Sequence, residues 1–322
     1  MQERTGYLFP GQGAQFVGMG RELYEREPAV RALYEQAEQA SGLELRRLSF
    51  EGPEAELTRT DVCQPAILLA SLAALQVLRR LAPAGQPVLQ PAALAGLSLG
   101  EYTALVAAGA LEPLAAVQLV AARGRFMQQA CEARRGAMAS LLGAQIAEVE
   151  AVVAELSTPQ APVVVSNYNA PHQVVISGAA EAVERAAAVL LERRAARRVI
   201  ALKVAGAYHS PLMEPAAEQL RAELERVEIR PPAVPVLSNV TGAPHPADEP
   251  GAIRELLARQ VAAPVRWTDC LRHMLRAGIR CYYELGPGQV LAGTLRAVDD
   301  EARCTSLMAA ADFEEAGWTW RS

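Results

Sequence analysis

The sequence has almost no lysine and few aromatic residues. Lys203 is the only lysine among 31 basic residues, and Phe, Trp and Tyr together make up 5% of the 322 residues. The 36 acidic residues outnumber the basic ones, and the formal net charge is −5. A chain with this balance has no basic excess with which to bind a nucleic-acid backbone. We therefore expect no nucleic-acid partner.

Cysteine is also scarce. The five cysteines are scattered along the chain, and no two of them have the spacing of metal ligands. They predict reduced thiols rather than a disulfide framework or a metal site. The first residues lead directly into a strand-like segment at 6–9 and lack the apolar region of a signal peptide. These features predict a cytoplasmic protein without a resident metal.

No hydrophobic run is long. The longest, at residues 66–78, is too short to span a bilayer. It predicts a buried helix that follows Pro65, and we expect no membrane partner. Residues 19–80 are predicted to be mainly helical, with breaks at 41–42 and 51–53.

One glycine-flanked serine lies between a short apolar strand and a helix, at residues 92–109. The turn is Gly-Leu-Ser-Leu-Gly at residues 96–100. Gly-x-Ser-x-Gly in this position is typical of a nucleophile elbow, in which a strained turn exposes the serine hydroxyl. The helix N-terminus directs free N–H groups toward any oxyanion formed there, and Glu101 in its first turn suits the helix dipole. The alternative is an ordinary glycine-rich turn with an inert Ser98, but the strand–turn–helix context favours catalysis.

Residues 136–205 predict a separate unit. Strands are expected at 137–142, 162–166, 173–177 and 198–203, and helices at 146–156 and 180–194. This β-α-β-β-α-β order is that of ferredoxin-like domains. In the rest of the chain, we expect strands at 7–9, 92–96, 234–238 and, as the last clear one, 281–285.

Two charged or titratable residues stand out from their surroundings. Arg123 lies on the apolar stripe of a helix predicted at 113–130. It pairs with a core carboxylate, extends outward to solvent, or meets a charged ligand. His209 is the one histidine among four that ends a strand and precedes a helix, where catalytic groups of α/β sheets collect. A purely structural histidine is the alternative.

No aspartate lies between Ser98 and His209, so the chain order of a hydrolase triad is poorly supported. We expect instead a serine–histidine pair whose imidazole is held by a carbonyl or an amide. The loop at residues 10–15 presents glycine-rich backbone to a ligand or is a plain connection. Asn167 and Asn169 are expected to serve a turn.

Four arginines form a local basic cluster, either a solvated helix end or a docking patch for an acidic partner. They are Arg193, Arg194, Arg197 and Arg198.

In combination, these motifs resemble those of the malonyl-CoA:acyl carrier protein transacylases of fatty acid and polyketide synthesis, over nearly the whole chain. The similar blocks are Phe-Pro-Gly-Gln-Gly-Ala-Gln at 9–15, Gly-Leu-Ser-Leu-Gly-Glu-Tyr at 96–102, Arg-Gly-Arg-Phe-Met-Gln at 123–128, Asn-Tyr-Asn at 167–169, Gly-Ala-Tyr-His-Ser-Pro-Leu-Met at 206–213, Gln-Val-Ala-Ala-Pro-Val-Arg-Trp at 260–267 and Glu-Leu-Gly-Pro-Gly at 284–288. The resemblance implies an α/β-hydrolase-like large domain at 1–131 and 204–322, with a ferredoxin-like small domain inserted at 132–203.

The resemblance also implies catalytic roles. Ser98 would be the nucleophile and His209 the base, with the backbone carbonyl of Gln260 holding the imidazole. The backbone N–H groups of Gln12 and Leu99 would form the oxyanion hole.

Substrate-binding roles follow in the same way. Arg123 would pair with the malonyl carboxylate, and Tyr208 would favour malonyl over the bulkier methylmalonyl group. Asn167 and Asn169 would contact the substrate. The implied partners are malonyl-CoA and an acyl carrier protein that bears phosphopantetheine. No cofactor is implied, and we expect a monomer.

Two positions depart from the family pattern. Leu97 stands where the family usually has histidine, a variant associated with stand-alone acyltransferases that serve polyketide synthases in trans. His172 stands where glycine is common. Two rival functions share the motifs: an acyl-thioester hydrolase acting on carrier proteins, and a non-catalytic docking homologue.

Overall fold

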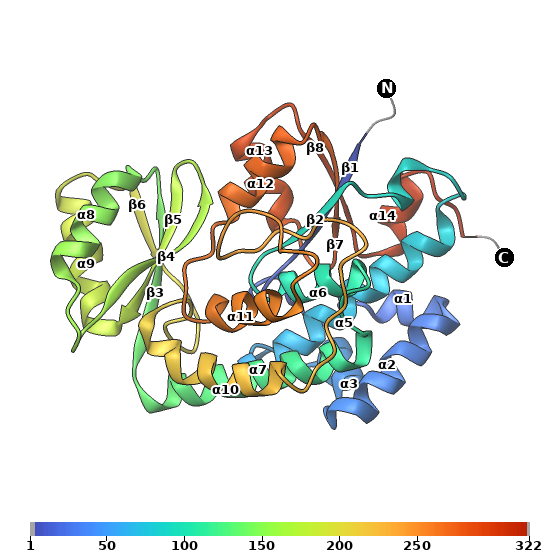
Figure 1. Cartoon of the computed structure of the whole chain (residues 1–322), viewed down its shortest axis with the longest axis horizontal. Coiled ribbons are helices and arrows are strands. Elements are labelled where there is room, and N and C mark those ends of the chain that lie inside the picture. Colours follow the sequence, from blue (N-terminus) through green and yellow to red (C-terminus); the bar gives the residue numbers. More distant parts are fainter. Residues whose placement is uncertain (1–3, 321–322) are drawn as a thin grey trace.

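The computed structural model describes residues 4–320, which contain two four-stranded β-sheets (Figure 1). In the first sheet all strands are parallel, in the order β2-β1-β7-β8. Its strands are β1 (Thr5–Phe9), β2 (Ala93–Gly96), β7 (Cys281–Leu285) and β8 (Arg303–Leu307). The second sheet is antiparallel, in the order β4-β5-β3-β6. Its strands are β3 (Gly136–Leu142), β4 (Val163–Ala170), β5 (Gln173–Ala179) and β6 (Arg198–Ala201).

Strand β1 is buried on both faces, as a parallel sheet requires. Tyr7 and Phe9 point into the larger core, whereas Leu8 between them joins a second cluster with Trp267 and Leu291. That second cluster is supplied by α12 (Trp267–Arg276) and α13 (Val290–Val298). The alternation follows from the two-residue period of a strand.

Most helices pack on the larger core. Two long ones, α5 (Thr60–Leu81) and α7 (Pro113–Ala133), pack against each other. The others in the first-sheet part of the chain are α1 (Arg21–Arg26), α2 (Pro28–Ser41), α3 (Leu45–Glu51), α4 (Glu54–Leu57), α6 (Gly100–Ala107), α10 (Glu214–Leu224), α11 (Pro250–Gln260) and α14 (Ala310–Glu315), with 3₁₀ turns η1 (Pro87–Leu89) and η2 (Pro211–Met213).

Helix α5 differs from the sequence prediction in its start and length. It begins at Thr60, so Pro65 lies inside the helix rather than before it. By length and composition α5 is sufficient to cross a membrane, so the argument that the apolar run is too short is wrong. However, 89% of its apolar window is buried inside the structure, which confirms the prediction of a buried helix.

The second sheet has the predicted β-α-β-β-α-β order, with α8 (Ile146–Leu156) and α9 (Ala180–Glu192) packed on it. Figure 1 shows this unit at one side of the molecule. It has its own hydrophobic core, which includes Leu141, Val149, Ile176 and Leu190. The α/β architecture with a ferredoxin-like second sheet is therefore confirmed. The domain boundaries at 131/132 and 203/204 remain a proposal.

Two strand predictions need correction at the edges of the first sheet. Residues 234–238 form only isolated bridges, although the backbone of Leu94 exchanges hydrogen bonds with Pro235 and Leu237. Proline has no N–H group, so this segment cannot continue a regular ladder. Conversely, the sequence does not predict β8, because exposed and intermediate positions alternate over residues 303–306 and only Leu307 is buried, which leaves little apolar signal.

The turn between β2 and α6 is the most constrained part of the first sheet. Ser98 has φ 52°, in the left-handed region that non-glycine residues rarely adopt. A Cβ on Gly96 would lie 1.9 Å from the carbonyl carbon and oxygen of Gly100, and a Cβ on Gly100 would lie 2.1 Å from the carbonyl oxygen of Phe9. Both glycines are therefore required by close backbone approach, as the sequence pattern predicts.

We predict that Gly96→Ala destabilises the protein, because the clash is with backbone that has no room to move. The melting temperature should fall by at least about 5 °C. Gly251→Ala is the matched control, since a Cβ at Gly251, in the first turn of α11, meets nothing within 4 Å. Thermal melts of both variants by circular dichroism test this. A Gly96→Ala melt that matches the wild type would contradict the steric argument.

Candidate active site

A pocket of about 490 Å³ lies where the two sheets meet. The loop after β1, the serine turn after β2, helix α7, strand β4 and the segment after β6 all contribute to it. Most of the predicted site residues line this pocket. They are Gln12, Ser98, Arg123, Asn167, Asn169, Tyr208 and His209, together with Leu97. Leu99 and Gln260 are buried directly behind the lining.

Ser98 and His209, 111 residues apart in the chain, are in contact. The distance from Ser98 Oγ to His209 Nε2 is 2.8 Å, and His209 Nδ1 lies 2.7 Å from the backbone carbonyl oxygen of Gln260. A carbonyl only accepts, so Nδ1 carries the proton and donates it, which leaves Nε2 free to accept the Ser98 hydroxyl. His209 also has a positive φ of 57°, so both partners are held in strained backbone.

The environment keeps His209 neutral. Burial and, to a smaller extent, the nearby Arg123 charge lower the pKa of His209 to about 4, against a weaker opposing effect of hydrogen bonds to the backbone of Gln260 and Ala263. A neutral imidazole at Nε2 is the form that can take a proton from the serine.

Arg123 is only 1% exposed, although it carries a charge. Its Nη1 donates to Gln64 Oε1 at 2.5 Å, and its Nη2 lies 3.0 Å from both Ser98 Oγ and Gln260 Oε1. Within residues 4–320 no carboxylate forms an ion pair with it. Burial lowers the pKa of the guanidinium. Of the three possibilities left by the sequence, pairing with a core carboxylate and extension to solvent are therefore both wrong.

Gln12 and Leu99 were expected to direct their backbone N–H groups at an oxygen near Ser98. Leu99 directly follows the serine and precedes α6, and Gln12 lies in the loop after β1. Neither N–H group has a hydrogen-bond acceptor in the part of the chain that the structure describes. Both are thus available to an oxygen in the pocket.

Tyr208 forms one wall of the pocket. Its hydroxyl lies 2.5 Å from Thr60 Oγ1 and 3.4 Å from Gln12 Nε2. Burial raises the pKa of Tyr208 to about 12, so the hydroxyl stays protonated at neutral pH. The contacts of this hydroxyl with Thr60 and Gln12 hold the ring in place.

Asn167 and Asn169 belong to β4 rather than to the turn after it, so the turn interpretation is wrong. Register shifts in β4 fall between Val165 and Asn167 and between Tyr168 and Ala170, where the strand meets the pocket. The backbone of residues 166–168 exchanges hydrogen bonds with Val265, which ties the second sheet to the segment that follows Gln260.

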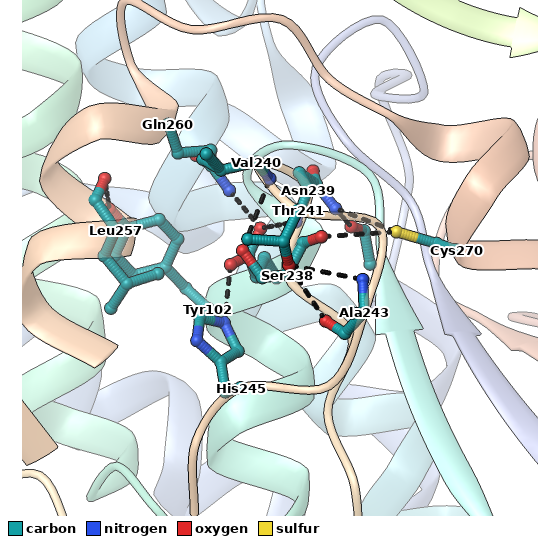
Figure 2. Close-up of polar contacts among 12 residues, drawn as sticks. Tyr102, Ser238, Asn239, Val240, Thr241, Ala243, His245, Leu257, Gln260 and Cys270 are labelled. Carbon is teal, nitrogen blue, oxygen red and sulfur yellow. Dashed lines mark hydrogen bonds and ion pairs between the residues drawn. The ribbon is translucent and has the colours of Figure 1, made fainter. Parts of the chain in front are cut away.

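Sequence reasoning missed three polar residues behind the pocket: Gln64, Glu101 and Asn239. Glu101 was expected only to suit the helix dipole, but it is fully buried and accepts hydrogen bonds from Asn239, His245 and Gln260. Figure 2 shows the three donors, Asn239, His245 and Gln260, close together. The partners of Glu101 lie 138 to 159 residues further along the chain. No local sequence pattern could therefore have indicated these contacts.

The arginine cluster is not part of this site. Arg193 pairs with Glu148 and Glu155, and the cluster lies before or at the start of β6, whereas the pocket is lined by the segment that follows the end of β6. His172 does not line the pocket either, and its ring contacts the carbonyl of Ala144. Docking through the arginine cluster stays an untested prediction.

Comparisons with known proteins agree with one another. The model of the acyl transferase domain family matches residues 6–310. The malonyl CoA-acyl carrier protein transacylase of Bacillus subtilis (strain 168) is 42% identical over 296 residues, which cover 92% of this chain and 90% of that protein.

Solved structures extend this similarity to the fold. The malonyl-CoA:acyl carrier protein transacylase of Xanthomonas oryzae pv. oryzae matches with a TM-score of 0.91 and 41% identity, over 99% of this chain and 100% of that one. A malonyl-transacylase in complex with its type II polyketide synthase acyl-carrier protein matches with a TM-score of 0.91 and 35% identity, over 98% and 99% of the two chains. This chain therefore belongs to the acyl transferase domain family and, within it, to the malonyl CoA-acyl carrier protein transacylases.

Proposed function

We propose that this chain transfers a malonyl group from malonyl-CoA to the phosphopantetheine thiol of an acyl carrier protein, through an ester on Ser98. The observation that carries the proposal is the buried Arg123, which forms no ion pair with a carboxylate of residues 4–320 and whose Nη2 lies 3.0 Å from Ser98 Oγ. The names of the relatives support the acyl group, and the relative in complex with an acyl-carrier protein supports the partner.

The first half-reaction forms the ester. His209 Nε2 takes the proton of Ser98 as Oγ attacks the thioester carbonyl carbon of malonyl-CoA. The resulting oxyanion accepts hydrogen bonds from the backbone N–H groups of Gln12 and Leu99, each worth roughly 3–4 kcal/mol. The C–S bond then breaks, and the CoA sulfur leaves with the proton from His209.

The second half-reaction reverses these steps with a different thiol. His209 takes the proton of the phosphopantetheine thiol, whose sulfur attacks the ester carbonyl on Ser98. When the C–O bond breaks, the proton returns to Ser98 Oγ. The two half-reactions share one site, so the kinetics are ping-pong. The chemistry needs no metal or redox cofactor.

Arg123 selects the acyl group. The malonyl carboxylate would replace amide oxygens as the acceptor of its Nη protons, and a guanidinium matches a carboxylate with two parallel hydrogen bonds. Asn167 and Asn169 line the same pocket and can contact the acyl group or the pantetheine arm. An acetyl group would leave the buried cation unpaired.

The rival functions have less support. A thioester hydrolase would use Ser98 and His209 but would have no use for Arg123, and none of the relatives reported above is named as a hydrolase. A non-catalytic homologue would have no reason to keep the Ser98–His209 contact at 2.8 Å. The monomeric state and the cytoplasmic location stay predictions.

The proposed function is tested by the intact mass of the protein after brief exposure to malonyl-CoA. We expect one malonyl adduct, which is absent in Ser98→Ala and disappears when a phosphopantetheine-bearing carrier protein is added. Release of free CoA without an adduct or an acceptor would indicate hydrolysis instead. The absence of both adduct and turnover would contradict the proposal.

Replacing Arg123 should change acyl selectivity rather than abolish chemistry. We expect Arg123→Ala to lower kcat/KM for malonyl transfer by about 100-fold or more, while acetyl transfer is kept or rises. Arg125→Ala is the matched control, because Arg125 lies on the same helix but is exposed. Steady-state transfer from both CoA esters measures this. Equal losses with the two acyl groups would rule out the carboxylate role.

Tyr208 should limit room beside the α-carbon of the acyl group. Tyr208→Ala should raise the ratio of methylmalonyl to malonyl transfer about tenfold or more, since one methyl group in a tight pocket has an effect of this size. Tyr208→Phe keeps the ring and should keep the wild-type ratio. Competition between the two CoA esters gives the ratio directly, and an unchanged ratio in Tyr208→Ala would contradict the steric role.

The pH dependence of Ser98 reactivity should reflect the lowered pKa of His209. The base is neutral above its pKa, so the rate should be level from about pH 5 upward and fall at lower pH with a midpoint near 4. Phenylmethanesulfonyl fluoride is a suitable probe, because it modifies activated serines and carries no carboxylate. In Arg123→Ala, the midpoint should move upward but stay below 6.5, since burial is the larger cause. A wild-type midpoint near 6.5 would show that His209 is not desolvated.

A further inference from the structure

Glu101 is a buried carboxylate that the proposed reaction does not use. It is fully buried in the first turn of α6. Its Oε1 accepts from His245 Nε2 at 2.7 Å, and its Oε2 accepts from the backbone N–H of Asn239 at 2.9 Å and from Gln260 Nε2 at 2.6 Å. Three donors from two separate segments thus compensate one charge that has no access to water.

Two short paths lead from this carboxylate to Ser98. On one side, Gln260 Nε2 also donates to the backbone carbonyl oxygen of Ser98 at 3.0 Å. On the other side, Asn239 Oδ1 accepts the backbone N–H of Ser98 at 2.6 Å, and Asn239 Nδ2 donates to the carbonyl oxygen of Gly96 at 2.8 Å. The strained Ser98 backbone is therefore held on both its N–H and its C=O side.

The charge of Glu101 also decides the orientation of the Gln260 amide. A carboxylate only accepts hydrogen bonds, so it requires the NH₂ group of Gln260 to face it. The amide oxygen then faces the opposite way, where it accepts from Arg123 Nη2 at 3.0 Å. A neutral group in place of Glu101 would remove this constraint, because an amide or hydroxyl accepts and donates.

The imidazole of His245 reaches the site through Glu101. Its ring is fully buried and does not line the pocket, and its Nδ1 has no hydrogen-bond partner among the residues that the structure describes. Among these residues Glu101 is the one hydrogen-bond partner of the ring, and the backbone N–H of His245 donates to the carbonyl oxygen of Val236. A buried carboxylate that loses one of its hydrogen-bond donors is destabilised, and it can lower its free energy by moving toward water or toward other donors.

We propose that Glu101 and His245 are positioning residues of the acyl-transfer site: His245 fixes the Glu101 carboxylate, and Glu101 fixes the Ser98 backbone and the amide that faces Arg123. This inference rests on the proposed function, because the residues are positioned for acyl transfer. The experiment that tests it, however, requires only that Ser98 reacts. The competing explanation is that this buried pair contributes to stability alone.

The test is a double-mutant cycle read out by the rate at which phenylmethanesulfonyl fluoride modifies Ser98, measured by intact mass. The variants are Glu101→Gln, His245→Leu and the double variant. We expect each single variant to lose about tenfold or more in rate, as small misplacements of reacting groups do. The double variant should lose no more than the larger single loss, because His245 acts through Glu101.

Two further variants separate positioning from stability. His245→Gln retains an N–H donor for Glu101 and should recover most of the rate lost in His245→Leu. Val236→Ala removes buried side-chain volume from the same 234–245 segment and keeps the backbone carbonyl that accepts the N–H of His245, so it should lower the melting temperature but keep the rate within about threefold of the wild type.

The inference is overturned if both single variants keep the wild-type rate, if the losses multiply in the double variant, or if Val236→Ala loses as much. It is also overturned if the wild-type serine does not react at all. A wild type that reacts with the reagent but takes no malonyl group would contradict the proposed function and leave the positioning result intact. A wild type that takes a malonyl group, with variants that react at the wild-type rate, would support the proposed function and contradict the positioning roles of Glu101 and His245.

Discussion

The buried charge of Arg123 determines which groups can lie next to it in the site. A guanidinium without access to water needs acceptors, yet a carboxylate in contact with it would neutralise it and remove its use for a substrate. The structure supplies uncharged acceptors instead, from Gln64, Gln260 and Ser98. The same constraint explains why a backbone carbonyl holds His209: a carboxylate there would be drawn to Arg123 and would raise the pKa of the imidazole. The carboxylate of Glu101 does not contact Arg123 directly, because the amide of Gln260 lies between the two groups.

The fold brings these groups together from distant parts of the chain. Strands β1 and β2 are parallel neighbours, so their carboxyl ends place the loop of Gln12 and the turn of Ser98 at one edge of the first sheet. The second sheet closes the pocket with β4, which is anchored to Val265 by backbone hydrogen bonds. Residues 260–265 therefore connect His209, through the Gln260 carbonyl, to the wall that carries Asn167. His209 and this wall of the pocket are thus positioned by one continuous set of backbone contacts.

Sequence could predict the parts of this arrangement that depend on local pattern. The serine turn needs glycine at positions 96 and 100, and the order of strands and helices at 136–201 specifies the second sheet. It could not predict contacts made across the chain. Glu101 lies in the first turn of a helix, where a solvated carboxylate is common, and only its long-range partners show that it is buried. Pro65 suggested a helix start that the packing of α5 against α7 overrides, and Pro235 prevents the apolar segment around it from becoming a regular strand.

The most direct measurement is a crystal structure of the protein acylated by a brief soak with malonyl-CoA. We expect an ester on Ser98 whose carbonyl oxygen lies within hydrogen-bond distance of the backbone N–H groups of Gln12 and Leu99. Its free carboxylate should pair with Arg123, in place of the Ser98 and amide oxygens that the guanidinium contacts now. The contrary result is a malonyl carboxylate that points to solvent or to Lys203, while Arg123 stays bound to Gln64 and Gln260. That result would show that the buried guanidinium does not bind the substrate carboxylate.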